Sequence, residues 1–202
     1  MSAEIAFVGD IHGNLNALRG LCEVLAARGG PHAIFLGDYI NKGAQSAEVM
    51  EELLTYSGSG RATLLRGNHE AALLDALDTE DLTAFLKMGG AMTIRSYVGA
   101  KVRPDVLNDF RARFPSEHLD GMRRMPETYE MNDFIAQHTP PSASTRKFRV
   151  SAHVTVGQLP KIGPNSAQLD TGCGSGDGRL TALLWPCLDY VQVDADGAIV
   201  TS

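Results

Sequence analysis

Short apolar runs and longer segments with helical spacing alternate through the first part of the chain. Residues 5–8 and 33–36 are apolar, residues 62–65 are apolar except for Thr63, and a polar turn containing glycine follows each run. Apolar residues recur at helical spacing in 15–25 and 49–54, between these runs. A repeated order of strand, polar turn and helix predicts a parallel sheet with helices on its faces. The polar turns then lie beyond the carboxyl ends of the strands, where such sheets bind ligands.

The pattern changes in the later part of the chain. Residues 70–125 are predicted to be mainly helical, and 128–131 with 134–137 predict a hairpin that turns at Asn132 and Asp133. Further short strands are predicted near 149–151, 167–169, 180–184, 190–193 and 198–200. We therefore predict one α/β domain over residues 1–202, in which the C-terminal third forms a second, mostly antiparallel sheet.

Composition narrows the class of protein. The 202 residues carry a net charge of -6 and an isoelectric point of about 5.5, which disfavours an extended nucleic-acid surface or a membrane surface. A phosphorylated substrate stays possible, because bound metal ions can invert the local field. The three cysteines show no paired spacing, and no apolar run is long enough to span a membrane. These features, with no signal-peptide pattern, predict a cytoplasmic protein.

Polar clusters stand where the predicted strands end. They read G-D-I-H-G-N at 9–14, G-D-Y-I-N-K-G at 37–43 and R-G-N-H-E at 66–70. Asp10 and Asp38 are 28 positions apart, and Asp38 and Asn68 are 30 apart, which matches one βαβ crossover each. Two histidines, His138 and His153, stand at the ends of later predicted strands.

Each of these residues alone has an ordinary structural explanation. An aspartate after a strand is often a turn residue, Asn68 could cap a helix, and His138 could lie in the core. Together they form a mixed oxygen and nitrogen donor set, which suits manganese, iron or zinc. The predicted metal ligands are Asp10, His12, Asp38, Asn68, His138 and His153. A central carboxylate can bridge two such ions, which activate a water and clamp a phosphoryl group.

The motifs resemble those of the calcineurin-like metallophosphoesterases. Within that family, the phosphoprotein phosphatase branch and its bacterial members carry G-D-x-H-G, G-D-x-x-D-R-G and G-N-H-E, followed by two separated histidines. The segments at 88–97 and 169–173, M-G-G-A-M-T-I-R-S-Y and L-D-T-G-C, resemble bacterial members, and the second also resembles symmetrical dinucleoside-tetraphosphate hydrolases. The resemblance implies a four-layer α/β/β/α sandwich, with two mixed sheets flanked by helices.

The resemblance also implies roles for individual residues. Asp10, His12 and His153 would bind a first divalent ion, Asp38 would bridge, and Asn68 with His138 would complete the second ion's site. His69 would protonate the leaving group as the general acid, and Arg66 would help to hold the phosphate. The implied cofactor is a pair of divalent ions, manganese foremost, with iron, zinc or cobalt as alternatives.

The second motif departs from the family at two positions. Asn41 stands where an aspartate would pair with the catalytic histidine, and it can orient the ring without supplying charge. Lys42 stands where an arginine would bind phosphate. Its ammonium group is a point charge, whereas a guanidinium group forms bidentate hydrogen bonds. Only 15 positions separate His138 from His153, and Arg146 and Arg149 are the candidates to hold phosphate in this interval, with the start of a strand as the alternative explanation of Arg149.

These observations leave three functions open. The first is a metal-dependent phosphatase for phosphomonoesters or phosphoproteins. The second keeps the chemistry but acts on dinucleoside polyphosphates or phosphodiesters, where protonation of the leaving group can matter less. The third is a non-catalytic regulator that binds metal or phosphate, because Asn41 and Lys42 depart from the family motif.

Overall fold

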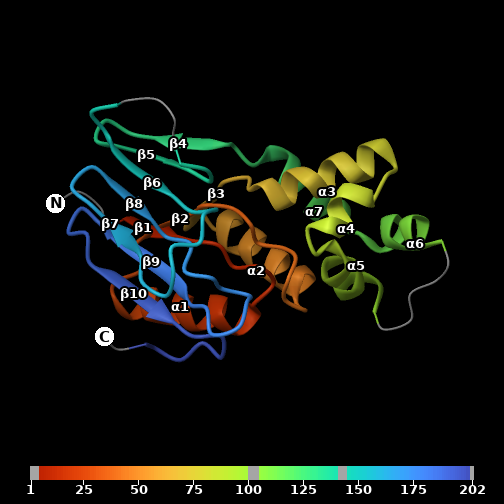
Figure 1. Ribbon diagram of the computed structural model, residues 1–202, viewed down its shortest axis with the longest axis horizontal. Coiled ribbons are helices and arrows are strands. Elements are labelled where there is room, and N and C mark those ends of the chain that lie inside the picture. The colour runs from red at the N-terminus through yellow and green to blue at the C-terminus, as the bar shows by residue number, and fades with distance from the viewer. Residues whose placement is uncertain (1–4, 100–104, 141–144, 201–202) are drawn as a thin grey trace.

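Two five-stranded sheets pack face to face in the computed structural model, which describes residues 5–99, 105–140 and 145–200 (Figure 1). In the first sheet the strand order is β10-β9-β1-β2-β3. Its members are β1 (Ile5–Val8), β2 (His32–Phe35), β3 (Ala62–Leu64), β9 (Leu180–Trp185) and β10 (Tyr190–Val193). The three N-terminal strands are parallel, as predicted, and β9 runs antiparallel to both β1 and β10.

The second sheet has the order β4-β5-β6-β8-β7. Its strands are β4 (Thr128–Glu130), β5 (Phe134–Gln137), β6 (Phe148–Ser151), β7 (Lys161–Ile162) and β8 (Ser166–Gln168). The central strands β5, β6 and β8 are parallel, and only the two edge strands are antiparallel.

The prediction of two mixed sheets flanked by helices is therefore confirmed, but their composition needs correction. The second sheet is not mostly antiparallel, and the strands near 180–184 and 190–193 belong to the first sheet. The predicted strand at 198–200 is reduced to one bridge between Ile199 and Val193. Alternation of apolar residues reports that a strand is half-buried but not which sheet it joins, which explains the error.

The helices gather on one side of the sandwich and at one end of it (Figure 1). The outer face of the first sheet is covered by α1 (Leu15–Ala27) and α2 (Ser46–Gly58). A lobe beside α2 contains α3 (Asn68–Thr79), α4 (Thr83–Lys87), α5 (Gly90–Val98), α6 (Val106–Arg113) and α7 (Ser116–Arg124). Within the described ranges, no helix lies over the outer face of the second sheet, so these residues form three of the four layers that the resemblance implies (Figure 1). None of the described helices combines the length and apolar character that crossing a membrane requires.

Two apolar cores lie on either side of the first sheet. Phe7 and Ile34 face Phe134 and Val150 of the second sheet and form the core between the sheets. Their neighbours on β1 and β2, such as Val8, point the other way and pack under the helices. Successive strand residues point to opposite faces, so β1 and β2 must be apolar at nearly every position. This explains the unbroken apolar runs in the sequence.

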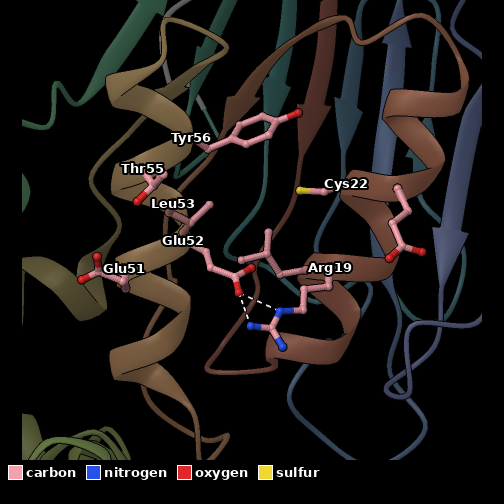
Figure 2. Close-up of a pocket in the computed structure, with 9 residues that line it drawn as sticks. Arg19, Cys22, Glu51, Glu52, Leu53, Thr55 and Tyr56 are labelled. Atoms are coloured by element: carbon pink, nitrogen blue, oxygen red, sulfur yellow. Dashed lines mark hydrogen bonds and ion pairs between the residues drawn. The ribbon is translucent and has the colours of Figure 1, made fainter.

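A cavity of about 360 Å³ opens between α1 and α2, as Figure 2 shows. Arg19 of α1 forms an ion pair with Glu52 of α2, and Cys22 faces the same space as Tyr56. Burial, together with the negative charge of Glu52, raises the pKa of the Cys22 thiol to about 11. The thiol therefore stays protonated near neutral pH and offers no nucleophile. All three cysteines are free, as the lack of paired spacing predicted.

The packing of α1 against the C-terminal turn generates a test of the fold. A Cβ at position 20 would lie 2.1 Å from the carbonyl oxygen of Gly197, a backbone atom that cannot rotate away. We expect Gly20→Ala to lower the free energy of unfolding by about 1–3 kcal/mol in urea denaturation. Gly58→Ala is the control, because a Cβ there meets nothing within 4 Å. It should be neutral or stabilising by up to about 1 kcal/mol. Equal effects of the two substitutions would contradict the close packing at Gly20.

Candidate functional site

Loops from both sheets meet at the edge where the parallel strands end. Asp10 follows β1, Asp38 follows β2, and Asn68 opens α3 just after β3. His138 follows β5, and His153 lies just beyond β6. The six residues predicted as metal ligands are thus brought together from five strand ends, although the outermost are 143 positions apart in the chain.

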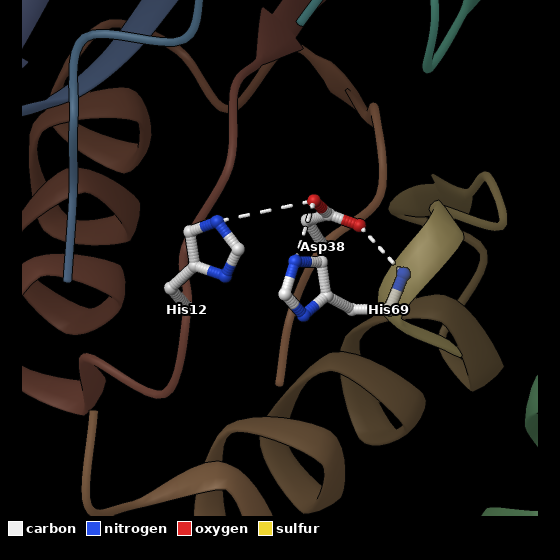
Figure 3. A group of neighbouring side chains, drawn as sticks. All are labelled: His12, Asp38 and His69. Atoms are coloured by element: carbon white, nitrogen blue, oxygen red, sulfur yellow. Dashed lines mark hydrogen bonds and ion pairs between the residues drawn. The ribbon is translucent and has the colours of Figure 1, made fainter. Parts of the chain in front are cut away.

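One group of side chains surrounds the Oδ2 atom of Asp38. The Nε2 atom of His12 lies 3.6 Å from Asp10 Oδ2 and 3.8 Å from Asp38 Oδ2. The Nε2 atom of His69 lies 3.7 Å from the same Asp38 oxygen, and Figure 3 shows both rings directed at this carboxylate. Asp10, His12 and Asp38 are almost completely buried.

A second group surrounds the other carboxylate oxygen, Asp38 Oδ1. The Nε2 atom of His138 lies 3.3 Å from it and 2.8 Å from Asn68 Oδ1. The Nδ1 atom of His153 lies 2.9 Å from the same asparagine oxygen and 3.1 Å from His138 Nε2. The resemblance grouped His153 with Asp10 and His12. In the structure its ring lies with Asn68 and His138, and its backbone N–H points to Asp10.

In each group, one histidine is oriented by a hydrogen bond from its Nδ1 atom to a backbone carbonyl. His12 Nδ1 lies 3.0 Å from the carbonyl oxygen of Ile40, and His138 Nδ1 lies 3.0 Å from that of Leu36. A carbonyl oxygen only accepts, so each Nδ1 carries a proton, and when the ring is neutral its Nε2 presents a lone pair to the centre. Two sets of candidate ligand atoms share Asp38, one with His12 and His69 and the other with His138 and His153, and the atoms of each set lie within 4.8 Å of one another. Carboxylate, amide oxygen and imidazole nitrogen are suitable ligands for a pair of divalent ions.

The charges in this cluster depend strongly on one another. Burial opposes ionisation of Asp38, but the hydrogen bond and charge of His138 outweigh it and lower its pKa to about 2. Burial likewise disfavours the charged form of His138, yet the carboxylates of Asp38 and Asp10 raise its pKa to about 9. Burial raises the pKa of Asp10. Without bound metal ions, the proton on His138 thus balances part of the negative charge of Asp38 and Asp10.

Glu70 organises the loop that carries Asp38, a role that the sequence interpretation missed. This fully buried carboxylate accepts N–H groups from Asp38 at 2.9 Å, Tyr39 at 2.8 Å, Ile40 at 3.3 Å and Gly67 at 3.0 Å. Asp38 in turn accepts the backbone N–H of His69 at 3.1 Å. Burial raises the pKa of Glu70 to about 7, and the charge of Asp38 adds to this effect. The only sequence signal was its place at the end of the G-N-H-E motif.

Asn41 fixes the tautomer of His69. The amide nitrogen of Asn41 lies 2.5 Å from His69 Nδ1 and 3.3 Å from the Met88 carbonyl oxygen, which can only accept. Thr93 donates to the amide oxygen at 2.7 Å, so the nitrogen must face the ring. His69 Nδ1 therefore accepts, and the proton sits on Nε2, which points to Asp38. Thr93 was not predicted, although it lies in the segment at 88–97 that carried part of the resemblance.

The three predicted phosphate-binding residues lie in different places. Lys42 Nζ is 2.7 Å from His12 Nε2, inside the cluster. Arg66 lies at the rim, where it pairs with Glu127 at 2.8 Å beside a 240 Å³ cavity that Asn68 and His138 also line. Arg146 is not brought to the site. It is exposed and precedes β6, whereas His153 follows that strand, so the two lie at opposite ends of it.

The backbone of the site is unusual. Five residues other than glycine have positive φ here: His12 at 49°, Asp38 at 57°, Asn41 at 72°, Lys42 at 57° and His153 at 65°. This left-handed conformation is unfavourable for side chains other than glycine, at about 1–3 kcal/mol each. It directs neighbouring side chains of one loop into the same small volume, which a regular strand or helix would not do.

Solved structures with the same fold come from phosphatases and related proteins. A candidate diadenosine tetraphosphatase matches with a TM-score of 0.69 and 19% identity, over 96% of this chain and 94% of that one. A cold-active protein-tyrosine phosphatase from a psychrophilic Shewanella species matches with a TM-score of 0.61 and 15% identity, over 98% and 80%. A metallophosphoesterase from Sphaerobacter thermophilus matches at 0.54 and 14%, over 98% and 88%. At these identities the matches establish the fold.

The family follows from the sequence. The model of the calcineurin-like phosphoesterases matches residues 3–169, which include every residue of the two ligand groups described above. The match agrees with the order of the polar clusters along the chain and with their convergence at one sheet edge. The chain belongs to the calcineurin-like phosphoesterase family, a family of hydrolases.

Proposed function

We propose that this protein hydrolyses phosphate esters at a centre of two divalent metal ions, held by Asp10, His12, Asp38, Asn68, His138 and His153. The observation that carries the proposal is the pair of ligand groups around the two oxygens of Asp38. The carbonyl oxygens of Ile40 and Leu36 support it, because they turn the lone pairs of His12 and His138 toward the centre. Phosphomonoesters and phosphoproteins are the first substrate class.

The chain's own groups have distinct tasks in this proposal. Two divalent ions, manganese foremost, would neutralise phosphoryl charge and make a water molecule more acidic. Lys42 and Arg66 add positive charge on the substrate's side of the cluster. His69 presents its Nε2–H group to the oxygen of the leaving group and acts as the general acid in its protonated form, which keeps a proton on Nδ1 after the transfer. Asn41 and Thr93 hold the ring in the orientation that this requires.

The bridging carboxylate provides the main test. We expect manganese-loaded protein to hydrolyse p-nitrophenyl phosphate, and Asp38→Asn to lower kcat/KM about 100-fold or more, because both ligand groups lose a charge. Asp75→Asn removes an exposed carboxylate from α3 and should leave the rate unchanged. The same measurement is made with bis(p-nitrophenyl) phosphate, a phosphopeptide and a dinucleoside tetraphosphate as substrates. Protein that binds manganese but hydrolyses none of them would instead support the non-catalytic regulator.

Metal binding should also release a proton. Below pH 9 His138 is protonated in the protein alone, and an ion must displace this proton to use the Nε2 lone pair. The apparent affinity for manganese should therefore rise with pH, by up to about tenfold per unit, and level off near pH 9. Titration calorimetry at pH 7 in buffers of different ionisation enthalpy measures the release. His32→Gln, at the far end of β2, is the control and should not change it. Binding without proton release would rule out this role of His138.

Hydrolysis of phosphoanhydrides, as in dinucleoside polyphosphates, is a second candidate function. Burial lowers the pKa of His69 to about 4. The charge of Asp38 acts in the opposite direction, and the charges of His12 and Lys42 cancel part of that increase. Asn41 adds no carboxylate, and its N–H group would oppose a proton on His69 Nδ1. A neutral ring donates a hydrogen bond but is a poor proton donor. This favours leaving groups that need no proton, such as a phosphate.

Replacement of Asn41 separates the two candidates. Asn41→Asp supplies the missing charge, which should raise the pKa of His69. The alkaline limb of the pH–rate profile, where His69 loses its proton, should then move to higher pH. The rate with an alkyl phosphate should rise more than the rate with p-nitrophenyl phosphate, whose leaving group is acidic. Asn41→Ser removes the amide without adding charge and should not move the limb upward. An unchanged profile in Asn41→Asp would remove the proposed role of this residue.

A further inference from the structure

The uncovered face of the second sheet carries an ordered array of polar side chains. Inward positions of β6 and β8 pack in the core between the sheets, so the alternate residues point outward. Strand register places Arg149 beside Ser166, and Ser151 beside Gln168. Lys161 of β7 pairs with Gln168 from the other side. These side chains line a cavity of about 360 Å³.

The cavity is positively charged in a protein whose net charge is -6. Arg149 and Lys161 line it, and no carboxylate does, among the residues that the structure describes. Glu130 stands on the same face but forms an ion pair with Lys147 at 2.8 Å. Neither Arg149 nor Lys161 has an ion-pair partner in the described part of the chain. The two positive charges therefore face the cavity uncompensated.

Arg149 provides an independent sign of a missing partner. Its Nε atom is shielded from solvent and has no hydrogen-bond acceptor in the described residues. Buried donors are almost always paired in folded proteins, and a guanidinium presents a fork of donors that matches an oxyanion. Ser151 and Ser166 offer hydroxyl groups, and Gln168 an amide, on the same wall. All of these groups can donate a hydrogen bond.

We propose that this cavity, lined by Arg149, Lys161, Ser151, Ser166 and Gln168, is a second anion site, which binds the phosphate group of a small molecule. Its volume exceeds that of a single ion, so part of the attached molecule fits beside the phosphate. Arg149 is four residues before His153, or about 13 Å along an extended strand, whereas Ser151 and Pro140 at the other end of the cavity are two residues from His153 and His138. The charged groups that would bind the anion thus lie on the outer face of the sheet, away from the metal centre, and the proposal stands whether or not that centre is catalytic.

Residue-resolved NMR titration tests the proposal on the full chain. Inorganic phosphate and AMP are added to protein treated with EDTA, and the amide signals of Gly163 and Ser166 are followed. We expect saturable shifts at these positions, weakened by added sodium chloride. Tighter binding of AMP than of phosphate would show that the attached molecule contributes. Shifts confined to residues around Asn68 and His138, or none at all, would overturn the proposal.

Matched variants assign the binding to individual charges. Arg149→Gln should weaken phosphate binding about tenfold or more. Arg149→Lys keeps the charge but loses the bidentate donors, so its affinity should lie between those of Arg149→Gln and the unchanged protein. Arg149 is half-buried, so Lys161→Gln, an exposed position, provides a second measurement that does not depend on packing. It should weaken binding about threefold to tenfold. Arg95→Gln removes the same charge from an exposed position on α5 and should change nothing. Equal affinity in all four variants would refute the assignment.

Discussion

The buried carboxylate of Glu70 determines the shape of the candidate site. Its two oxygens accept consecutive backbone N–H groups from the loop after β2 and one from the turn before α3. Those groups have no strand partner where the chain leaves the sheet, and unpaired N–H groups are costly in the interior. The carboxylate therefore ties two loops together and places Asp38 between the two ligand groups. Asn41 and Lys42 follow in the same loop, so their positions depend on the same contact.

The sequence was sufficient for the parts of the molecule that local pattern controls. Spacing and polarity predicted β1, β2 and β3 and the convergence of residues at their carboxyl ends, because parallel strands share one edge. Sheet membership of β9 and β10 was not predictable in this way. Their alternation fits either sheet, and only long-range pairing with β1 decides between them. The two-residue strand β7 is too short to leave any pattern.

The candidate site residues show the same difference between what local pattern predicts and what long-range contacts decide. The convergence of the candidate ligands was predictable, since each of them follows a strand whose end lies at the same edge. Arg146 was a candidate because it lies between His138 and His153 in the sequence, but it precedes β6 and His153 follows that strand. The loop between them runs back to the start of β6, so closeness along the chain does not mean closeness in space. Glu70 and Thr93 escaped prediction because their partners are backbone groups and an amide in a loop of irregular conformation.

Asn41 shows that the candidate ligands and the proton donor His69 are oriented by different contacts, although Glu70 holds the loop that carries both Asp38 and Asn41. The ligand atoms take their orientation from backbone carbonyls and from Glu70, none of which contacts the amide of Asn41. Proton donation by His69 depends instead on Asn41 and Thr93. Substitution in this second set can therefore change the preferred leaving group while the ligand set is retained.

The positive φ angles at His12, Asp38, Asn41, Lys42 and His153 limit how this site can be stabilised. Glycine would relieve the backbone at each of these positions, but it would remove the side chain that the site uses. The conformation of these loops and the chemistry of the site therefore make opposite demands on the same residues.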